Sequence, residues 1–304
     1  MASGSSLPVK DQGFYLDSST AAEPPRFSYS KHLLHKLWVN KLSMFSLLIL
    51  LLFLILALFP NHLILIDPGK TNMSQAVHAP SVHNPFGSDR LGRDMFSRVI
   101  YATRVSLILP CTSVFFGLFI GGFLGMISGY LGGWTDTLIS RTLDLIFGLP
   151  ILLFAIVVVA FLGAGVVNAI LAMTIIFIPL FARMVRGSVL TVRNNEYVEA
   201  TIALGSSQNR VLFAHILPNI FAPILVQAMM QIASAILIEA SVSFLGLGTT
   251  SENPSWGRML YDNSSILELA PWASIFPGLA IVLVIVSFNL IADALRDALD
   301  VTLY

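Results

Sequence analysis

The sequence predicts an all-α integral membrane protein with six transmembrane helices. Of the 304 residues, 56% are hydrophobic and 11% are charged, whereas roughly 25% of the residues of an ordinary soluble domain are charged. Charge-free stretches long enough to cross the hydrocarbon core of a bilayer recur along the chain. A mean hydropathy of +0.81 also excludes a disordered chain, which would contain far less apolar surface.

The predicted spans follow directly from the charge-free stretches. These stretches are residues 42–59, 105–128, 145–182, 211–238 and 269–292. A transmembrane helix needs about 20 residues, and the third stretch is about twice that length. Because Gly163-Ala164-Gly165 lies in its middle, we expect two helices joined by a tight turn. The total is six spans.

The spans divide the chain into three parts. Residues 1–30, rich in Ser, Pro and Gly, predict a disordered cytoplasmic tail. Residues 31–104 contain the first span and an outer loop, and residues 105–304 contain the other five spans. The first span begins too far from the N-terminus for a cleaved signal peptide, so we expect it to be a retained helix.

The distribution of Lys and Arg predicts the orientation in the membrane. With the N-terminus inside, eleven of these residues fall in inner segments and six in outer segments. Cytoplasmic segments are enriched in Lys and Arg, so we expect both termini inside. Four of the six outer residues lie in residues 89–104, which opposes this orientation, but the first inner flank usually dominates insertion.

No catalytic or metal-binding pattern is present in the sequence. Pro68-Gly69-Lys70-Thr71 imitates the end of a phosphate-binding loop, but Ile64 occupies the required upstream glycine position. The single cysteine and six scattered histidines do not have the spacing of a metal site. We therefore expect no enzyme activity, cofactor or metal in this chain. Its net charge of zero also disfavours a nucleic-acid partner.

The most informative polar segment is residues 193–218. Asn194 or Asn195 can cap a helix, and Glu196 and Glu199 lie in its first turn, where the helix dipole favours negative charge. Gly205 supplies the left-handed residue that ends such a helix. We therefore predict a short helix, a glycine turn and a second helix.

Apolar residues of this short helix form a stripe on one face. Tyr197, Ala200, Ala203 and Leu204 follow helical spacing. The stripe suits a helix that lies across the cytoplasmic surface and fits a groove of a partner protein. An interfacial helix without a partner explains the residues equally well.

The same segment resembles the EAA loop of membrane subunits of ABC importers. That motif consists of Glu-Ala-Ala, three residues, Gly, nine residues and Ile-x-Leu-Pro, and the spacing matches throughout. Thr201 replaces the second Ala, and His215 stands at the Ile position. The resemblance implies a role in coupling to an ATPase for Glu196, Tyr197, Glu199, Ala200, Thr201, Leu204, Gly205, His215, Leu217 and Pro218.

Two further segments narrow the resemblance to one branch of this family. Residues 84–98 and residues 239–260 resemble parts of the C-type permease of oligopeptide, dipeptide and nickel importers. The resemblance runs from about residue 30 to residue 300 and implies a type I ABC importer permease fold, with its core domain in residues 105–304 and the coupling loop in residues 193–218.

The resemblance also implies a function and a set of partners. A second, homologous permease completes the pore in a bacterial cell membrane, two ABC ATPases bind ATP and Mg on the inside, and an extracytoplasmic binding protein delivers the ligand. Short peptides are the leading cargo, with nickel, metallophore complexes or glutathione as alternatives. A secondary transporter and a membrane scaffold are the alternatives from other classes; the former would need more intramembrane charges.

Two acidic residues lie within a predicted span or at its edge, where a charged side chain needs a partner. Glu239 lies deep in a span, where a buried carboxylate is costly. It either lines the pore or is a hydrogen-bonded structural residue, and the structural interpretation is preferred. For Asp144 we expect an ion pair with Arg141, one helical turn away.

Two sequence patterns predict helix surfaces. Glycines recur every fourth residue in the second span and predict a packing seam within the bundle or with the partner permease. These glycines are Gly117, Gly121, Gly125 and Gly129. In residues 90–104, apolar residues at every fourth position can form an amphipathic helix at the outer surface. Such a helix would contact either the binding protein or lipid headgroups.

Overall fold

The computed structural model describes residues 41–64 and 66–300, and the secondary structure in these ranges is helical. Five helices found there are long and apolar enough to cross a membrane. They are α2 (Lys41–Leu58), α4 (Met95–Leu131), α7 (Val166–Arg193), the continuous run Gln208–Phe244 that ends with α10 (Leu217–Phe244), and α12 (Trp272–Asp300). The prediction of an all-α membrane protein is confirmed, while the predicted tail at residues 1–30 lies outside the described residues.

The third predicted span, the first half of residues 145–182, is a bent pair of helices. α5 (Gly133–Phe147) and α6 (Ile151–Leu162) are inclined at 84° to one another. The prediction of a straight span that starts at residue 145 is therefore wrong. Pro150 occupies the N-cap of α6, and a proline disfavours helical geometry at the residue before it, so the chain turns there. Because α6 ends and α7 begins on either side of residues 163–165, the predicted split at Gly163-Ala164-Gly165 is present.

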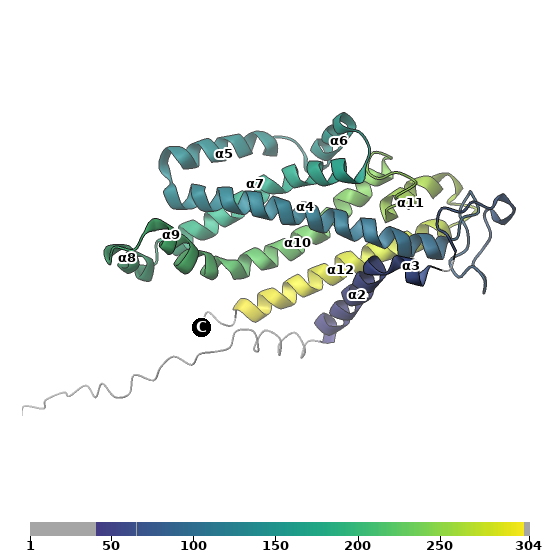
Figure 1. Ribbon diagram of the computed structural model, residues 1–304, viewed down its shortest axis with the longest axis horizontal. Helices are drawn as coiled ribbons and strands as arrows, with labels where there is room; N and C mark the ends of the chain where they lie inside the picture. Colours follow the sequence, from purple (N-terminus) through teal and green to yellow (C-terminus); the bar gives the residue numbers. More distant parts are fainter. Residues whose placement is uncertain (1–40, 65, 301–304) are drawn as a thin grey trace, which may run out of the picture.

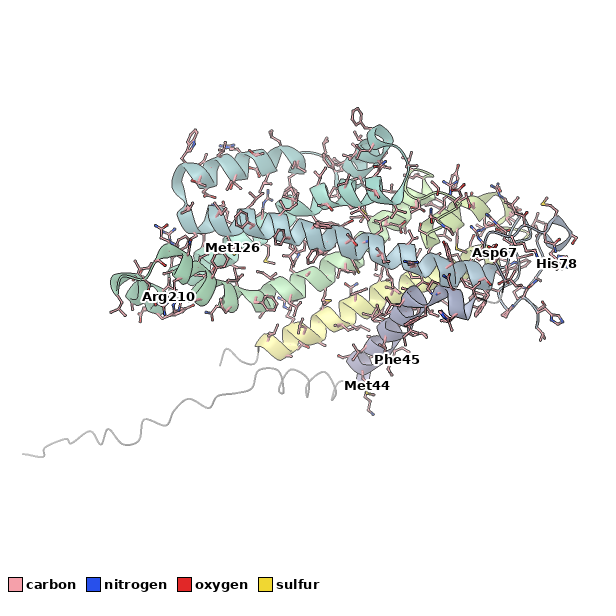
Figure 2. The ribbon with its side chains drawn as sticks, viewed as in Figure 1. Met44, Phe45, Asp67, His78, Met126 and Arg210 are labelled. Carbon is pink, nitrogen blue, oxygen red and sulfur yellow. The ribbon has the colours of Figure 1, made fainter. Side chains whose placement is uncertain are left out.

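Short helices connect the long ones. They are α3 (Pro60–Leu63), η2 (Met73–Gln75), α8 (Glu196–Ala203), α9 (Gln208–Arg210), η3 (Val211–Ile216), α11 (Trp256–Asn263) and η4 (Ser264–Ile266). Figure 1 shows that α8 and α9 lie at one end of the long axis, whereas α3 and α11 lie at the other. Figure 2 labels Arg210 at the first of these ends and Asp67 and His78 at the second. The segment that contains α8 and α9 is therefore separated from the loop that contains Asp67 and His78 by the length of the long helices.

α4 and α7 run side by side through the middle of the molecule (Figure 1). The glycine ridge of α4 faces α7 within the same chain. A Cβ atom added to Gly117 would lie 2.5 Å from Cβ of Phe177, and one added to Gly121 would lie 2.3 Å from the carbonyl oxygen of Ile178. At Gly125 the corresponding distance to the carbonyl oxygen of Ala182 is 2.4 Å. Only glycine permits the two backbones to approach this closely.

A second contact region surrounds Trp256, the first residue of α11. The indole is fully buried, and its Nε1–H donates to the carbonyl oxygen of Val99 on α4 over 3.1 Å. Phe53 of α2 packs edge-on against it, with ring centroids 5.5 Å apart. A buried aromatic ring whose N–H is satisfied contributes both apolar burial and orientation. Trp256 therefore joins α2, α4 and α11 at the end opposite α8.

Candidate functional site

The first candidate site is the loop that contains α8. Val198 is the buried residue of this helix, and it belongs to one hydrophobic cluster with Val185 and Val189 of α7 and Val211 and Ile216 of η3. Burying one valine side chain contributes roughly 1.5–3 kcal/mol. This contact attaches α8 to α7 and to η3 at once. The sequence pattern does not reveal Val198 as a site residue, because its burial depends on elements on both sides of the loop.

The other face of α8 is uncovered in this chain. The side chains of Tyr197, Ile202 and Leu204 are 43%, 47% and 88% exposed. Glu196 and Glu199, in the first turn, are exposed as well. The helix therefore presents an apolar edge and an acidic end to its surroundings while its opposite side is fixed to the bundle.

The ends of α8 follow the sequence prediction with one difference. Asn195 occupies the N-cap position, but its side chain forms no capping hydrogen bond. Gly205 adopts the left-handed conformation, with φ of +81°, and its N–H donates to the carbonyl oxygen of Ile202 over 2.9 Å. Thr201 donates its hydroxyl to the carbonyl oxygen of Tyr197 over 2.7 Å. The hydroxyl of Thr201 thus finds a partner within α8, so the threonine does not interrupt the helix.

The rest of the predicted motif forms the junction with α10. η3 is a π-helical turn, and α10 follows it directly, with Pro218 in its first turn. A proline lacks the N–H that a regular helix needs at that point, and π-turns occur where the regular hydrogen-bond ladder is interrupted. His215 is half-buried in η3, and its carbonyl oxygen accepts a hydrogen bond from Asn219 over 2.6 Å. Leu217 packs partly buried against the cluster around Val198.

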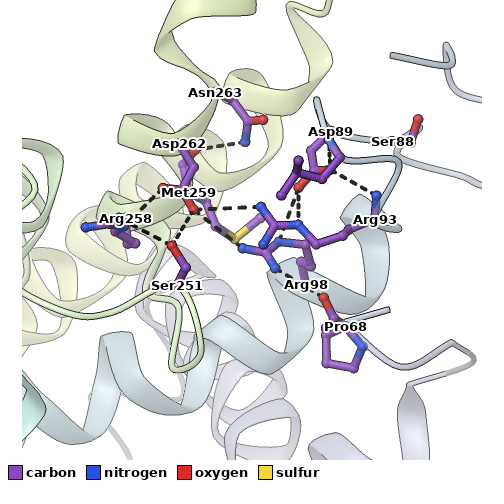
Figure 3. A network of polar contacts seen from close by, with 12 residues as sticks. Pro68, Ser88, Asp89, Arg93, Arg98, Ser251, Arg258, Met259, Asp262 and Asn263 are labelled. Carbon is purple, nitrogen blue, oxygen red and sulfur yellow. Dashed lines mark hydrogen bonds and ion pairs between the residues drawn. The ribbon is translucent and has the colours of Figure 1, made fainter. Parts of the chain in front are cut away.

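The second candidate site is a buried network of charges at the opposite end of the molecule (Figure 3). Arg93 Nε lies 2.6 Å from Asp89 Oδ2, and Arg258 Nε lies 3.0 Å from Asp262 Oδ1. Between them, Arg98 Nε lies 3.8 Å from Asp89 and its Nη2 lies 3.9 Å from Asp262. Two carboxylates therefore share three guanidinium groups, and the network joins the segment before α4 to α11.

This network corrects the expectation of an amphipathic surface helix in residues 90–104. The helix begins at Met95, after Asp94, whose carboxylate accepts from the backbone N–H of Ser97 over 2.8 Å. Arg93 and Arg98 are 6% and 1% exposed, so they do not contact lipid headgroups or a docking protein. Their carboxylate partners come from a loop and from a distant helix, and the local helical pattern does not reveal these partners.

The expected ion pair between Arg141 and Asp144 is wrong. Asp144 instead pairs with Arg183 of α7, with Oδ1 to Nη2 3.0 Å. Arg183 also lies over the ring of Phe147, 4.3 Å from its centroid. The bend between α5 and α6 places α5 along α7, so the acidic side chain of Asp144 meets an arginine of another helix.

Glu239 is buried in α10 and is 2% exposed. Its Oε1 accepts a hydrogen bond from Ser243 Oγ over 2.7 Å, and Ser243 Oγ in turn accepts from the backbone N–H of Thr249 over 3.3 Å. The adjoining cavity measures about 10 Å³, roughly the space of one water molecule. Within this chain, Glu239 is therefore surrounded by packed side chains. Its hydrogen bond to Ser243 continues to Thr249, in the loop before α11.

Comparisons with known proteins agree with this architecture. Residues 121–302 match the model of the family described as binding-protein-dependent transport system inner membrane component. The chain is 42% identical to the dipeptide transport system permease protein DppC of Alkalihalophilus pseudofirmus over 284 residues, which cover 93% of this chain and 92% of that protein. It is 45% identical to the glutathione transport system permease protein GsiD of Pectobacterium atrosepticum over 221 residues, 73% of each chain.

A third relative matches a longer part of the chain than the second. The glutathione transport system permease protein GsiD of Escherichia coli is 40% identical over 271 residues, 88% of this chain and 89% of that protein. Membership of a binding-protein-dependent transport system implies ATPase and binding-protein partners, and it excludes a secondary transporter that works alone. The chain belongs to the family of binding-protein-dependent transport system inner membrane components and is a multi-pass permease subunit of an ABC importer.

Proposed function

We propose that this chain is the C-type permease of an ATP-driven importer that moves short peptides into the bacterial cytoplasm. The match to a permease named for dipeptide transport extends over almost the full length of both chains. Two other relatives are named for glutathione, which is itself built from three amino acids. Glutathione is therefore the alternative cargo within the same class. Nickel or metallophore complexes are a further alternative, which only the resemblance of the sequence motifs supports.

The observation that supports ATPase coupling most directly is the two-sided environment of α8. Val198 attaches the helix to α7 and η3, while Tyr197 and Leu204 are exposed. A groove in an ATPase subunit would cover that exposed edge, as helices commonly dock into grooves by their apolar face. Closure of the ATPases on ATP then moves α8, and the Val198 contact transmits the movement to α7 and, through η3, to α10.

The proposed assembly has four kinds of partner. A homologous second permease completes the translocation path, two ABC ATPases bind ATP and Mg, an extracytoplasmic binding protein delivers the peptide, and bilayer lipid surrounds the long helices. The large apolar residues that α2 exposes support the lipid or permease contact; among them are Leu47, Leu48 and Leu52, between 52% and 57% exposed.

We propose that the α8 end faces the cytoplasm, together with both chain termini. The excess of Lys and Arg in the segments on that side supports this orientation. Leu204→Cys at the C-cap of α8 and Val82→Cys in the loop at the other end test it, because both residues are highly exposed. A membrane-impermeant thiol reagent should label Val82→Cys in intact cells and Leu204→Cys only after permeabilisation, and the reverse pattern would reject the orientation.

We also propose that Glu239 and the α4 glycines have structural roles. The hydrogen bond from Ser243 and the small adjoining cavity support this role for Glu239. The short Cβ distances to α7 support it for Gly117, Gly121 and Gly125. Glu239→Gln should then retain peptide uptake, whereas a pore-lining carboxylate would lose it with assembly intact.

Purification of the tagged chain from native membranes tests the proposed function as a whole. We expect a second six-span permease and one or two ABC ATPases to copurify. In proteoliposomes with the binding protein, this complex should take up labelled dipeptide only with ATP. Preferential uptake of glutathione would select the alternative cargo. Recovery of the chain alone, with solute uptake driven by an ion gradient, would reject the proposal.

A further inference from the structure

A groove lies along α4 at the end of the molecule opposite α8, and it consists of two adjoining cavities. The first measures about 410 Å³ and is lined by Asp67, Arg98 and Glu252 among others. The second measures about 230 Å³ and is lined by Arg104 and Asn253. Tyr101 lines both cavities, so they lie next to each other on either side of this residue or against it. Ligand sites commonly have volumes of roughly 300–1,000 Å³.

The buried charge network builds the walls of this groove. Arg98 Nη1 donates to the carbonyl oxygen of Pro68 over 3.1 Å and so fixes the wall that contains Asp67. Arg258 Nη2 donates to Ser251 Oγ over 3.3 Å and fixes the wall that contains Glu252. Arg98 is 1% exposed, so it acts as a positioning residue and leaves ligand contacts to the residues around it.

The charges that remain accessible differ between the two halves of the groove. Asp67 and Glu252 are exposed in the first cavity. One Asp67 oxygen accepts the Gly69 N–H over 2.8 Å, which leaves the other oxygen for a ligand. Arg104 is exposed in the second cavity and forms no ion pair with another residue in the described part of the chain. The groove is thus acidic at one end and basic at the other.

The floor of the groove is one face of α4. Tyr101, Arg104, Val105 and Ile108 follow the helical spacing that places side chains on one face. Arg98 lines the first cavity and Arg104 the second, and they are six residues apart on α4, so the two cavities are spaced along the helix by about 9 Å. The charged ends of an extended dipeptide or tripeptide are separated by roughly 7–10 Å. Val105 and Ile108 supply apolar surface beside the basic end.

We propose that this groove binds a short zwitterionic peptide on its way through the importer. The free ammonium group of the peptide lies against Asp67 and Glu252, its backbone crosses Tyr101, and its free carboxylate pairs with Arg104. The choice of a peptide rests on the proposed function. The requirement for opposite charges comes from the groove itself, which has exposed carboxylates in one cavity and an exposed guanidinium in the other.

Protection of an introduced cysteine tests this site in the assembled importer. Val105→Cys is placed in a Cys111→Ala background, and its modification by a membrane-impermeant thiol reagent is timed with and without alanyl-alanine. Val82→Cys, which replaces a 97% exposed residue outside the groove, is the control. By mass action, peptide at ten times its dissociation constant should slow modification of Val105→Cys about tenfold and leave Val82→Cys unchanged.

Two further comparisons make the charge requirement specific. N-acetyl-alanyl-alanine amide, which lacks both charges, should not protect Val105→Cys. Adding Arg104→Gln should weaken protection by alanyl-alanine about tenfold, the loss expected for one charge-assisted hydrogen bond. Arg90→Gln, which replaces another exposed arginine before α4, should leave protection intact.

Several outcomes would overturn the site. These are a Val105→Cys that reacts slowly without peptide, equal protection by the blocked peptide, or no protection at all. Asn253→Cys on the facing wall is a second reporter in case Val105→Cys does not assemble. Uptake of alanyl-alanine by the Cys111→Ala importer is measured in parallel. Uptake without protection rejects the groove and leaves the proposed function standing, whereas absence of uptake rejects the proposed function.

Discussion

Arg186 of α7 donates two hydrogen bonds to Asp136 of α5, with Nε 2.5 Å from one carboxylate oxygen and Nη2 2.7 Å from the other. Ser128 of α4 donates a third hydrogen bond to the same carboxylate over 2.5 Å. α5 has no buried residue of its own. This carboxylate therefore fixes the first half of the bent span to both central helices.

The first prediction concerns that contact. A double-mutant cycle with Asp136→Asn and Arg186→Gln should give a coupling energy of about 1 kcal/mol, because the pair is bidentate and only partly exposed. The midpoint of unfolding in a detergent titration measures it. The Asp144–Arg183 pair, with side chains 54% and 61% exposed, is the matched comparison and should give less than about 0.5 kcal/mol. Equal couplings would contradict this difference.

The second prediction concerns the glycine seam. Gly121→Ala places a Cβ 2.3 Å from the carbonyl oxygen of Ile178, so α4 and α7 must separate. We expect a loss of about 1–3 kcal/mol in unfolding free energy and a lower yield of assembled protein. Gly187→Ala is the control on α7, where an added Cβ meets no atom within 4 Å. If both variants unfold at the same midpoint, the seam does not limit packing.

The third prediction concerns the buried charge network. Asp262→Asn removes the carboxylate partner of Arg258 and leaves Arg93 and Arg98 with Asp89 alone, and breaking a buried pair on one side costs about 3–5 kcal/mol. We expect a large fall in the unfolding midpoint and loss of the fixed position of α11. Glu268→Gln, at an exposed acidic residue nearby in the chain, should change stability by less than about 0.5 kcal/mol. A stable Asp262→Asn protein would show that the network is dispensable.

The fourth prediction separates the two faces of α8. Leu204 is 88% exposed, so Leu204→Glu should leave the unfolding midpoint unchanged while it abolishes copurification of the ATPase. Val198 is fully buried, so Val198→Asp should lower the midpoint by burying an unpaired charge. Quantitative mass spectrometry of the purified complex reports the first effect. Retention of the ATPase by Leu204→Glu would place the docking surface elsewhere.

The sequence was sufficient for features that depend on local chemistry. The long helices follow from uninterrupted apolar stretches, and α8 follows from its first-turn acids and from Gly205, which has the predicted positive φ. The glycine period of α4 also predicted a close helix contact, although it did not identify α7 as the neighbour.

Features that depend on residues far apart in the chain were missed. α5 contains Asp136, Arg141 and Asp144, and these charges hid it from a search for apolar spans. Arg98 resembled a surface residue because its partner Asp262 belongs to α11. Val198 resembled any other residue of a short helix, since its neighbours lie in α7 and η3.

The central claim, that α8 couples ATP hydrolysis to peptide movement, is tested most directly by Gly205→Val. An added Cβ there meets no atom within 4 Å, but φ of +81° strains any residue with a branched side chain. Peptide uptake and ATP hydrolysis are measured in the same proteoliposomes. We predict continued hydrolysis with far fewer peptides imported per ATP than in the unmodified importer, and an unchanged ratio in Gly205→Val would contradict the claim.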